Sequence, residues 1–527
     1  MKRSALYNIY PSLYNGIDDI AQDIPRIKDL GFEGVWINPL FETSSVPSPQ
    51  TQKSGSPYGP QSFRLDSTHT QGEQYSDAES SAAVRELTDL IRAEGMRVLA
   101  DVVFLHVAHS HPLITNDRDQ FLSCSVLSKI PDDIDTSRWF SSHTQNMGGD
   151  LWDDVIPFNF DDPEIKQQIL EYYLKPYASK IVKEWGFDGL RIDSAGLLPQ
   201  EIYEEIVYHA ENICKQEHGH DLSVLCETVG LAPNEYEHLN GVCDSCYSSS
   251  YWMLLGDLCE WQIEGQDHTL IIKNWHMGMD KTFPENQRLS ALYSHFSAVL
   301  NDDEGTLQHL NGFMKNYVAP TLGFIDNHDT ASSADIFRKM GFGDHAIRQL
   351  NRLAMAKMAF AHDGWFLTSG SEFLRDSSSV FTASPDDIHR DCVDNQDFVK
   401  QINETLASMP DVRQEWKQLV FDPLNPDIFA VIIHPEEGFK QKPDLIIVNT
   451  SDSPRIIDME FARQILNDGL DRSACTSHKE TTLSSVHLCG NVISAGDFGH
   501  VACFVNGDIN SVPEPKADSK AHKPSVN

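Results

Sequence analysis

The feature that most constrains the fold is an alternation of short apolar, β-compatible runs with helical segments over about the first 380 residues. The helical segments space their apolar residues helically, as in residues 17–32, where Gly31 would end the helix. Because strand–helix alternation builds a parallel sheet, eight such runs predict an α/β fold, a (β/α)8 barrel. The expected strands are residues 5–11, 34–40, 97–104, 187–193, 222–228, 241–247, 320–327 and 364–370.

Two parts of the chain depart from this alternation. The interval between the third and fourth strands is too long for a simple connection, so we expect an inserted excursion at about residues 107–160 within a barrel domain of residues 1–415. Short alternating segments with turn signals then predict a C-terminal antiparallel, sandwich-like β domain at 416–508. Residues 509–527 are polar and Pro-rich, and we expect disorder there. The C-terminal segments are 427–435, 444–450, 455–461, 484–490 and 500–507.

The composition excludes several classes of partner. Among 527 residues, 78 are acidic and 41 are Lys or Arg, which gives a formal charge of −37. That balance argues against nucleic acid and anionic membranes as partners and is compatible with a neutral substrate such as a sugar. No apolar run is long enough for a signal peptide or a membrane span. We therefore expect a cytoplasmic protein, with leaderless secretion and the oligomeric state left open.

Cysteine and histidine clusters raise a metal alternative. Cys243 and Cys246 form a C-x-x-C motif, but no second pair follows at metal-ligand spacing, and free thiols are the simpler interpretation of the ten cysteines. His106, His109 and His111 invite a zinc interpretation. A single cluster on a loop is more often polar surface or hydrogen-bonded structure, so we expect neither a metal nor a cofactor.

Polar residues recur where the expected strands end, and in a barrel the carboxyl ends of the strands share one face. Any one of them alone would more often be structural, for example a helix cap. Their convergence from four strands favours an active site. They are Asp101 and His106 after the third strand, Arg191 and Asp193 on the fourth, Glu227 on the fifth, and Asn327, His328 and Asp329 on the seventh.

Three carboxylates beside an arginine suit glycoside chemistry. A retaining glycosidase needs an ionised nucleophile and a protonated general acid about 5–5.5 Å apart. Arg191 and Asp193 alternate onto one strand face, where the guanidinium would lower the pKa of Asp193 and keep it charged. Burial after the apolar residues 222–226 would raise the pKa of Glu227 and keep it protonated. Asp329 could stabilise an oxocarbenium-like transition state.

Four segments resemble the conserved regions of the α-amylase superfamily, glycoside hydrolase family 13. They are "DVVFLH" (101–106), "GFDGLRID" (186–193), "VLCE" (224–227) and "FIDNHD" (324–329), in the family's order and spacing over about residues 5–380. The resemblance implies hydrolysis of α-1,4-glucosidic bonds in an α-glucan or maltooligosaccharide through a glycosyl-aspartate. It implies that Asp193 is the nucleophile, Glu227 the acid/base and Asp329 the transition-state stabiliser.

The same resemblance implies substrate-binding residues and shows departures. It assigns sugar binding to Arg191, His106 and His328, and "SPYGPQSF" (56–63) resembles the segment that supplies a stacking tyrosine, here Tyr58. Trp36, Trp152 and Trp252 lie near predicted rims and are further stacking candidates. There are three departures. Leu105 stands in place of a calcium-ligating asparagine, which predicts loss of that calcium site. Gly59 and Ser62 stand in place of acidic residues, and "SAGLLP" (194–199) lacks the usual acceptor-side basic residue.

Two alternatives stay open. "CDSCYSSSYW" (243–252) and "GWFLTSGSEF" (364–373) are similar to segments of maltosyltransferases in the same superfamily, although core or loop packing explains these short segments equally well. That alternative makes the protein an α-glucan transglycosylase. The departures at Leu105 and Ser62 also allow a catalytically inactive glycan-binding relative, against which stands the presence of all three carboxylates.

Overall fold

A computed structural model of the protein describes most of the first 408 residues and several strands beyond them. The description below concerns these residues. They are 5–44, 55–115, 125–140, 155–228, 242–248, 259–264, 269–274, 279–283, 322–330, 332–339, 342–376, 382–388, 395–408, 416–421, 428–434, 444–449, 485–488, 491–494 and 501–505.

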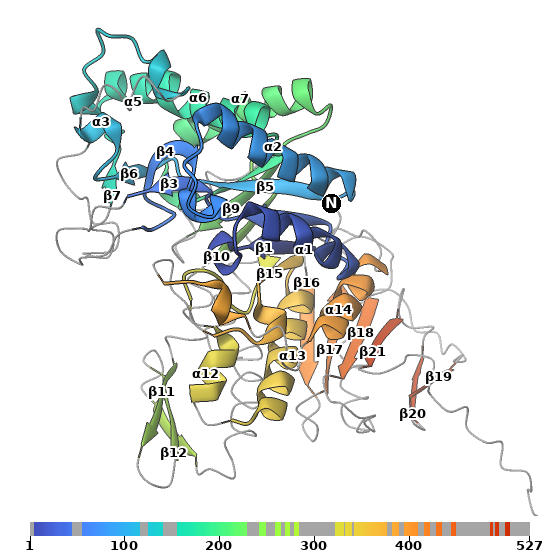
Figure 1. Cartoon of the computed structure of the whole chain (residues 1–527). Coiled ribbons are helices and arrows are strands. Elements are labelled where there is room, and N and C mark those ends of the chain that lie inside the picture. The colour runs from blue at the N-terminus through green and yellow to red at the C-terminus, as the bar shows by residue number, and fades with distance from the viewer. Residues whose placement is uncertain are drawn as a thin grey trace, which may run out of the picture.

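An eight-stranded parallel sheet forms the centre of the molecule (Figure 1). Its strand order is β10-β9-β8-β5-β2-β1-β15-β14, and the edge strands β10 and β14 contact each other. The sheet therefore curls into a nearly closed barrel, which confirms the (β/α)8 prediction. The strands are β1 (Ala5–Ile9), β2 (Gly34–Ile37), β5 (Arg97–Val102), β8 (Gly189–Ile192), β9 (Ser223–Thr228), β10 (Ser245–Ser248), β14 (Leu322–Gly323) and β15 (Gly364–Thr368).

All eight predicted strands are present, and most of them end earlier than predicted. The fourth ends at Ile192, so that Asp193 lies just past it. Of the described part of the seventh, residues 322–327, only Leu322 and Gly323 form a strand. The residues that follow the strand ends are still buried, as Phe324 and Ile325 are after the seventh strand. The sequence therefore stays apolar there although the backbone has left the sheet. Asp101, Arg191 and Glu227 lie near the ends of their strands, whereas Asp193 and the residues 327–329 lie past the ends of theirs.

Helices cover the barrel where the sequence spaces its apolar residues helically. In α1, Ile20, Ile24 and Ile27 are fully buried, and Gly31 follows the helix with a left-handed φ of 83°. A reciprocal capping box between Ser76 and Glu79 starts α2. The helices are α1 (Ile17–Asp29), α2 (Asp77–Ala93), α3 (Pro112–Thr115), α5 (Pro163–Ile169), α6 (Lys175–Ser179), α7 (Gln200–Glu217), α12 (Ser333–Lys339), α13 (Asp344–Ala361) and α14 (Gln396–Ser408).

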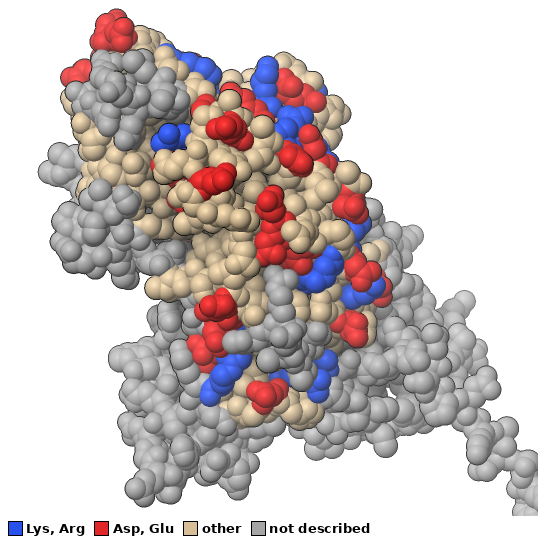
Figure 2. All heavy atoms as spheres, in the orientation of Figure 1, with Lys and Arg blue, Asp and Glu red and all other residues tan. Residues whose placement is uncertain are grey.

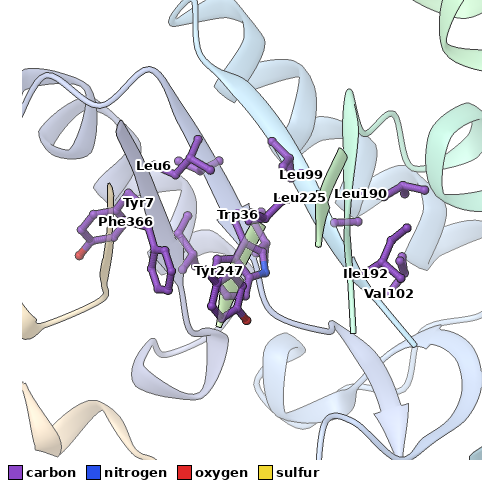
Figure 3. Close-up of a cluster of buried hydrophobic side chains, with 14 of the residues drawn as sticks. Leu6, Tyr7, Trp36, Leu99, Val102, Leu190, Ile192, Leu225, Tyr247 and Phe366 are labelled. Carbon is purple, nitrogen blue, oxygen red and sulfur yellow. The ribbon is translucent and has the colours of Figure 1, made fainter. Parts of the chain in front are cut away.

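Aromatic side chains fill the barrel beneath its polar end (Figure 3). Trp36 of β2 meets the ring of Phe366 of β15 at 5.1 Å between centroids, and Tyr247 of β10 meets the same ring at 5.0 Å. Trp36 is completely buried, so this candidate for stacking on sugar is instead a core residue. Trp152 and Trp252 lie outside the described residues.

Smaller sheets accompany the barrel. Within the predicted excursion, β6 (His106–Ala108) pairs with β7 (Val155–Pro157), and the hairpin of β3 (Phe41–Thr43) and β4 (Pro60–Leu65) lies next to β6. An unpredicted antiparallel sheet follows β10 in the chain. It consists of β11 (Cys259–Glu264), β12 (Thr269–Asn274) and β13 (Met279–Phe283).

Beyond the barrel, β17 pairs antiparallel with β16 and β18, while β18 pairs parallel with β21. This mostly antiparallel sheet matches the β character predicted there, although β16 was not anticipated and the predicted segment 455–461 lies outside the described residues. The domain boundaries remain predictions. No helix in the described part of the chain is long and apolar enough to cross a membrane. The strands are β16 (Trp416–Phe421), β17 (Ile428–His434), β18 (Asp444–Asn449), β19 (Ser485–Leu488), β20 (Asn491–Ser494) and β21 (Val501–Val505).

Candidate active site

Strand register stacks the polar residues in two levels at the carboxyl end of the barrel. Asp101 of β5 is the register partner of Arg191 of β8. Glu227 of β9 is the register partner of Tyr247 of β10, one inward-facing position closer to the strand ends. The site is therefore built by regular parallel pairing, which fixes the relative positions of the four side chains.

Arg191 lies at the centre of the site and is fully buried. Its Nη1 contacts Asp101 Oδ1 at 2.7 Å and Asp193 Oδ1 at 3.0 Å, and its Nη2 contacts Glu227 Oε2 at 2.7 Å. One guanidinium thus pairs with three carboxyl groups. Because a buried charge needs such partners, Arg191 and the carboxyl groups hold one another in place.

Asp101 ties this cluster to the neighbouring strands. Its Oδ2 accepts hydrogen bonds from Tyr58 Oη at 2.7 Å, Trp36 Nε1 at 3.0 Å and Asn38 Nδ2 at 3.2 Å. The sequence marked Asp101 as a strand-end acid without a role and did not mark Asn38. Asn38 lay inside the predicted second strand, residues 34–40, and only the structure ends that strand at Ile37, so no local signal distinguished this residue.

Glu227 binds to two donors through a single oxygen. Its Oε2 contacts Arg191 and also accepts the backbone N–H of Ser194 at 3.0 Å. Ser194 presents that N–H from a left-handed conformation, φ 46° and ψ 39°, which is uncommon for a residue other than glycine. Burial raises the pKa of Glu227 to about 7 against the opposing effect of Arg191, as the sequence predicted.

Asp193 differs from expectation. Burial raises its pKa to about 6, and the contact with Arg191 opposes this rise without cancelling it. The prediction that Arg191 lowers this pKa has the right sign for Arg191 itself, but it left out burial, which raises the pKa overall. The physical reason is the extent of burial, because the charged form loses more hydration than one shared guanidinium returns. Asp193 still ionises at a lower pH than Glu227.

Asp329 and His328 form the other side of the site. His328 Nε2 lies 3.0 Å from Asp329 Oδ2, and the Asp329 side chain is 46% exposed. Partial burial alone would raise the pKa of Asp329, but the contact with His328 outweighs it and lowers the pKa. The His328 ring stacks on Tyr58 at 4.8 Å with an angle of 17° between the planes. Asp329 is therefore the carboxylate of the three that is readily ionised and open to solvent.

The histidine cluster divides among different partners. His106 Nε2 lies 2.9 Å from the backbone oxygen of Tyr58, so His106 supports the segment that carries that ring. His111 is fully buried, and its Nδ1 lies 3.2 Å from the backbone nitrogen of Leu113. Among the described residues, no group of three or more His, Cys, Asp or Glu side chains is arranged to hold a metal ion. Cys243 and Cys246 carry free thiols.

The seven side chains to which the resemblance gives a catalytic or sugar-binding role all lie in or beside this site; they are Tyr58, His106, Arg191, Asp193, Glu227, His328 and Asp329. Arg191, Asp193 and Glu227 are in direct contact, and His328 and Asp329 join them through Asn38 and Tyr58. The group combines a carboxyl that holds its proton near neutral pH with two that ionise more easily. That combination suits protonation of a leaving group on one side and stabilisation of positive charge on the other.

A family model described as the catalytic domain of α-amylase matches residues 14–374, about two thirds of the chain. The chain belongs to the α-amylase family. The matched residues contain seven strands of the barrel and the complete site described above. Family membership agrees with the resemblance carried by the four sequence segments.

Two relatives align with part of this chain. An α-amylase from Haloarcula japonica is 22% identical over 241 residues, which cover 44% of this chain and 30% of that protein. A cyclomaltodextrinase from a Bacillus species is 25% identical over 207 residues, which cover 37% of this chain and 31% of that protein. The alignments thus span about a third of the length of these relatives.

Solved α-amylase structures share the fold. The enzyme from Lactobacillus plantarum is 18% identical with a TM-score of 0.52, over 82% of this chain and 86% of that one. The enzyme from Anoxybacillus is 14% identical with a TM-score of 0.57, over 85% and 87%. An α-amylase from Geobacillus thermoleovorans, complexed with acarbose, is 14% identical with a TM-score of 0.54, over 85% and 87%.

Proposed function

We propose that the protein is a retaining glycosidase that cleaves α-1,4-glucosidic bonds of starch- or glycogen-type glucans or maltooligosaccharides. The observation that carries this proposal is the shared guanidinium of Arg191, which binds Asp193 and Glu227 on neighbouring nitrogens. A retaining mechanism needs two carboxyl groups about 5–5.5 Å apart, and one guanidinium holds these two groups close together. The raised pKa of Glu227, about 7 against about 6 for Asp193, supports the acid role for Glu227 and the nucleophile role for Asp193.

The reaction proceeds in two displacements. In the first, the Asp193 carboxylate attacks the anomeric carbon while Glu227 gives its proton to the glycosidic oxygen, so that the aglycone leaves as an alcohol and a glycosyl ester forms. In the second, the Glu227 carboxylate takes a proton from water, whose oxygen attacks the same carbon and releases Asp193. Asp329 stabilises the positive charge in both transition states. Two inversions retain the α configuration.

Tyr58, His328 and His106 bind the sugar ring at the bond to be cleaved. The stacked pair of Tyr58 and His328 provides a flat face of the kind that packs against a pyranose ring, and Arg191 lies within 5.5 Å of the Tyr58 ring centroid. Since Asp101 and Asn38 hold the Tyr58 hydroxyl, this face is rigid before substrate arrives.

The test is Asp193→Asn, with Asp18→Asn as a control that removes the same charge from an exposed position on α1. We expect Asp193→Asn to lose at least about 10³-fold in turnover of maltoheptaose and glycogen, and Asp18→Asn to retain wild-type turnover. A 5-fluoro glycosyl fluoride should label Asp193 covalently, and proton NMR should detect the α anomer as the first product. Wild-type turnover by Asp193→Asn would refute the assignment.

The same glycosyl ester can pass to a sugar hydroxyl in place of water, which would make the protein a transglycosylase. One feature favours transfer to a sugar hydroxyl. In the turn directly after Asp193, Leu197 is 37% exposed and no basic residue occurs. Product analysis with maltoheptaose, with and without phosphate, distinguishes the reactions. Hydrolysis gives only shorter oligosaccharides, transfer to a sugar hydroxyl also gives longer ones, and transfer to phosphate gives a sugar phosphate.

A further inference from the structure

Tyr247 is a buried residue of the site that sequence analysis left unassigned. Its hydroxyl oxygen lies 2.6 Å from Arg191 Nη2 and 3.1 Å from Arg191 Nε. It is the register partner of Glu227 on the adjacent strand. Figure 3 shows it against Trp36 and Phe366 inside the barrel. The sequence presents it as an ordinary core aromatic on the weakest of the eight strands.

The N–H groups of Arg191 point to four partners. Nη1 donates to Asp101 and Asp193, and both Nη2 and Nε donate to Tyr247. Nη2 also forms an ion pair with Glu227 Oε2 at 2.7 Å. Tyr247 therefore accepts two of the five hydrogen bonds that a guanidinium can donate. It does so as a neutral group, which fixes the direction of the cation without adding a further negative charge.

The ring of Tyr247 is itself held firmly. It packs edge-on against Phe366 at 5.0 Å and Phe324 at 5.6 Å between centroids, and it lies 5.5 Å from Trp36 at a tilt of 39°. Contacts on several sides leave the hydroxyl little freedom to move. The hydroxyl is thus a fixed point from which Arg191 can be oriented.

We propose that Tyr247 is a positioning residue, which orients Arg191 so that this single cation is divided between the nucleophile Asp193 and the acid/base Glu227. The inference rests on the proposed roles of those two carboxyl groups. Without the hydroxyl, two N–H groups of a fully buried guanidinium lose their acceptor, which is costly. Glu227 Oε2 already lies 2.7 Å from Nη2, so the guanidinium turns toward Glu227 and stabilises its ionised form.

The consequence is a specific change in acid–base behaviour. A stronger contact with Arg191 lowers the pKa of Glu227, so that the general acid loses its proton at a lower pH. A Tyr247 that only filled space in the core would affect stability and leave this titration unchanged. The position of the basic limb of the pH–rate profile therefore separates the two roles.

The experiment compares Tyr247→Phe with Tyr14→Phe. Both remove one buried hydroxyl and keep the ring, and Tyr14 donates to Asp23 Oδ2 at 3.0 Å, on residues outside the candidate site. With maltoheptaose, we expect Tyr247→Phe to lower kcat roughly tenfold with little change in KM, and to move the basic limb of kcat/KM down by about half a pH unit or more. Tyr14→Phe should keep the wild-type limb. A wild-type limb in Tyr247→Phe would overturn the proposal.

A second measurement does not depend on turnover. The titration of the Glu227 carboxyl is followed by infrared difference spectroscopy, with Glu227→Gln identifying its band, in the wild-type protein and in Tyr247→Phe. A lower midpoint in Tyr247→Phe supports the positioning role even if the wild-type protein cleaves no glucan, which would refute only the proposed function. An unchanged midpoint refutes the positioning role even if the glycosidase assignment holds.

Discussion

Asp326 and Arg375 form a buried ion pair of 3.1 Å directly behind the segment that ends in Asp329. Arg375 Nη2 also donates to the backbone oxygen of Asn327 at 3.2 Å, and Asp326 Oδ2 accepts the backbone N–H of Ser333 at 3.1 Å. The pair therefore joins the end of β14 to the residues after β15 and to the start of α12. It fixes the backbone from which His328 and Asp329 extend.

We expect Arg375→Met to lower the free energy of unfolding by about 3–5 kcal/mol, because it leaves Asp326 buried without its cation. The double variant Asp326→Asn/Arg375→Met should recover part of that loss. Arg338→Met is the control, since its pair with Asp376 is partly exposed and should contribute about 1 kcal/mol or less. Urea unfolding curves measure all four proteins. Equal losses in Arg375→Met and Arg338→Met would contradict the structural role of the pair.

The pH dependence of activity follows from the two shifted carboxyl groups. Burial raises the pKa of Asp193 to about 6 and that of Glu227 to about 7. Asp193 must be ionised and Glu227 protonated, so kcat/KM should rise through about pH 6, peak between the two values and fall above about pH 7. Initial rates on maltoheptaose from pH 4 to about 9 give the profile. A profile that stays flat to pH 9 would exclude Glu227 as the general acid.

The same shift predicts that Glu227 reduces stability at neutral and basic pH. Its folded pKa is about 7, above the ordinary value of 4.5, so the unfolded chain ionises first as pH rises. Relative to Glu227→Gln, the wild-type protein therefore loses stability between about pH 4.5 and 7, and the difference stays constant above pH 7. The full difference is at most about 3 kcal/mol.

Unfolding free energies of Glu227→Gln and wild type at pH 5 and at about pH 8 test this expectation. Glu86→Gln, at an exposed position on α2, controls for the loss of one negative charge from an acidic protein. The advantage of Glu227→Gln should be larger at the higher pH, while Glu86→Gln should show little difference. A Glu227→Gln protein less stable than wild type at both pH values would show that Glu227 contributes to the fold through its contacts with Arg191 and Ser194.

The barrel and the three carboxylates could be predicted because both leave local signals. Strand–helix alternation is a property of the sequence, and parallel strands end on one face, so Asp193, Glu227 and Asp329 could be placed together without coordinates. The ends of the strands could not be predicted, since a segment such as 322–327 stays buried whether or not it is hydrogen-bonded as a strand.

The remaining errors concern properties that arise only from packing. Whether Arg191 or burial controls the pKa of Asp193 depends on how much solvent reaches the carboxylate, and no spacing rule reports that. Trp36 was placed near a predicted rim, yet its ring points into the barrel (Figure 3) and its Nε1 donates to Asp101. In the sequence, Tyr247 cannot be told from an ordinary core aromatic residue. Its proposed role depends on its hydroxyl, which accepts a hydrogen bond from Arg191 two strands away in the sheet.

The acidic surface predicts a strong dependence of stability on salt. Asp and Glu side chains are spread over the face shown in Figure 2, with fewer Lys and Arg among them, in keeping with the charge of −37. Like charges repel across the folded surface, and raising the salt concentration from about 0.01 M to about 1 M shortens the screening length from about 30 Å to about 3 Å. We therefore expect Tm to rise by several degrees over this range in sodium chloride.

Salt can raise Tm by screening the like charges or by strengthening apolar burial. A triple variant with less negative charge separates these two causes; its substitutions, at three exposed positions, are Glu73→Lys, Glu86→Lys and Asp133→Lys. If screening is responsible, this variant should have a higher Tm than wild type at low salt and gain less from added salt; an equal gain in both proteins would assign the effect to apolar burial.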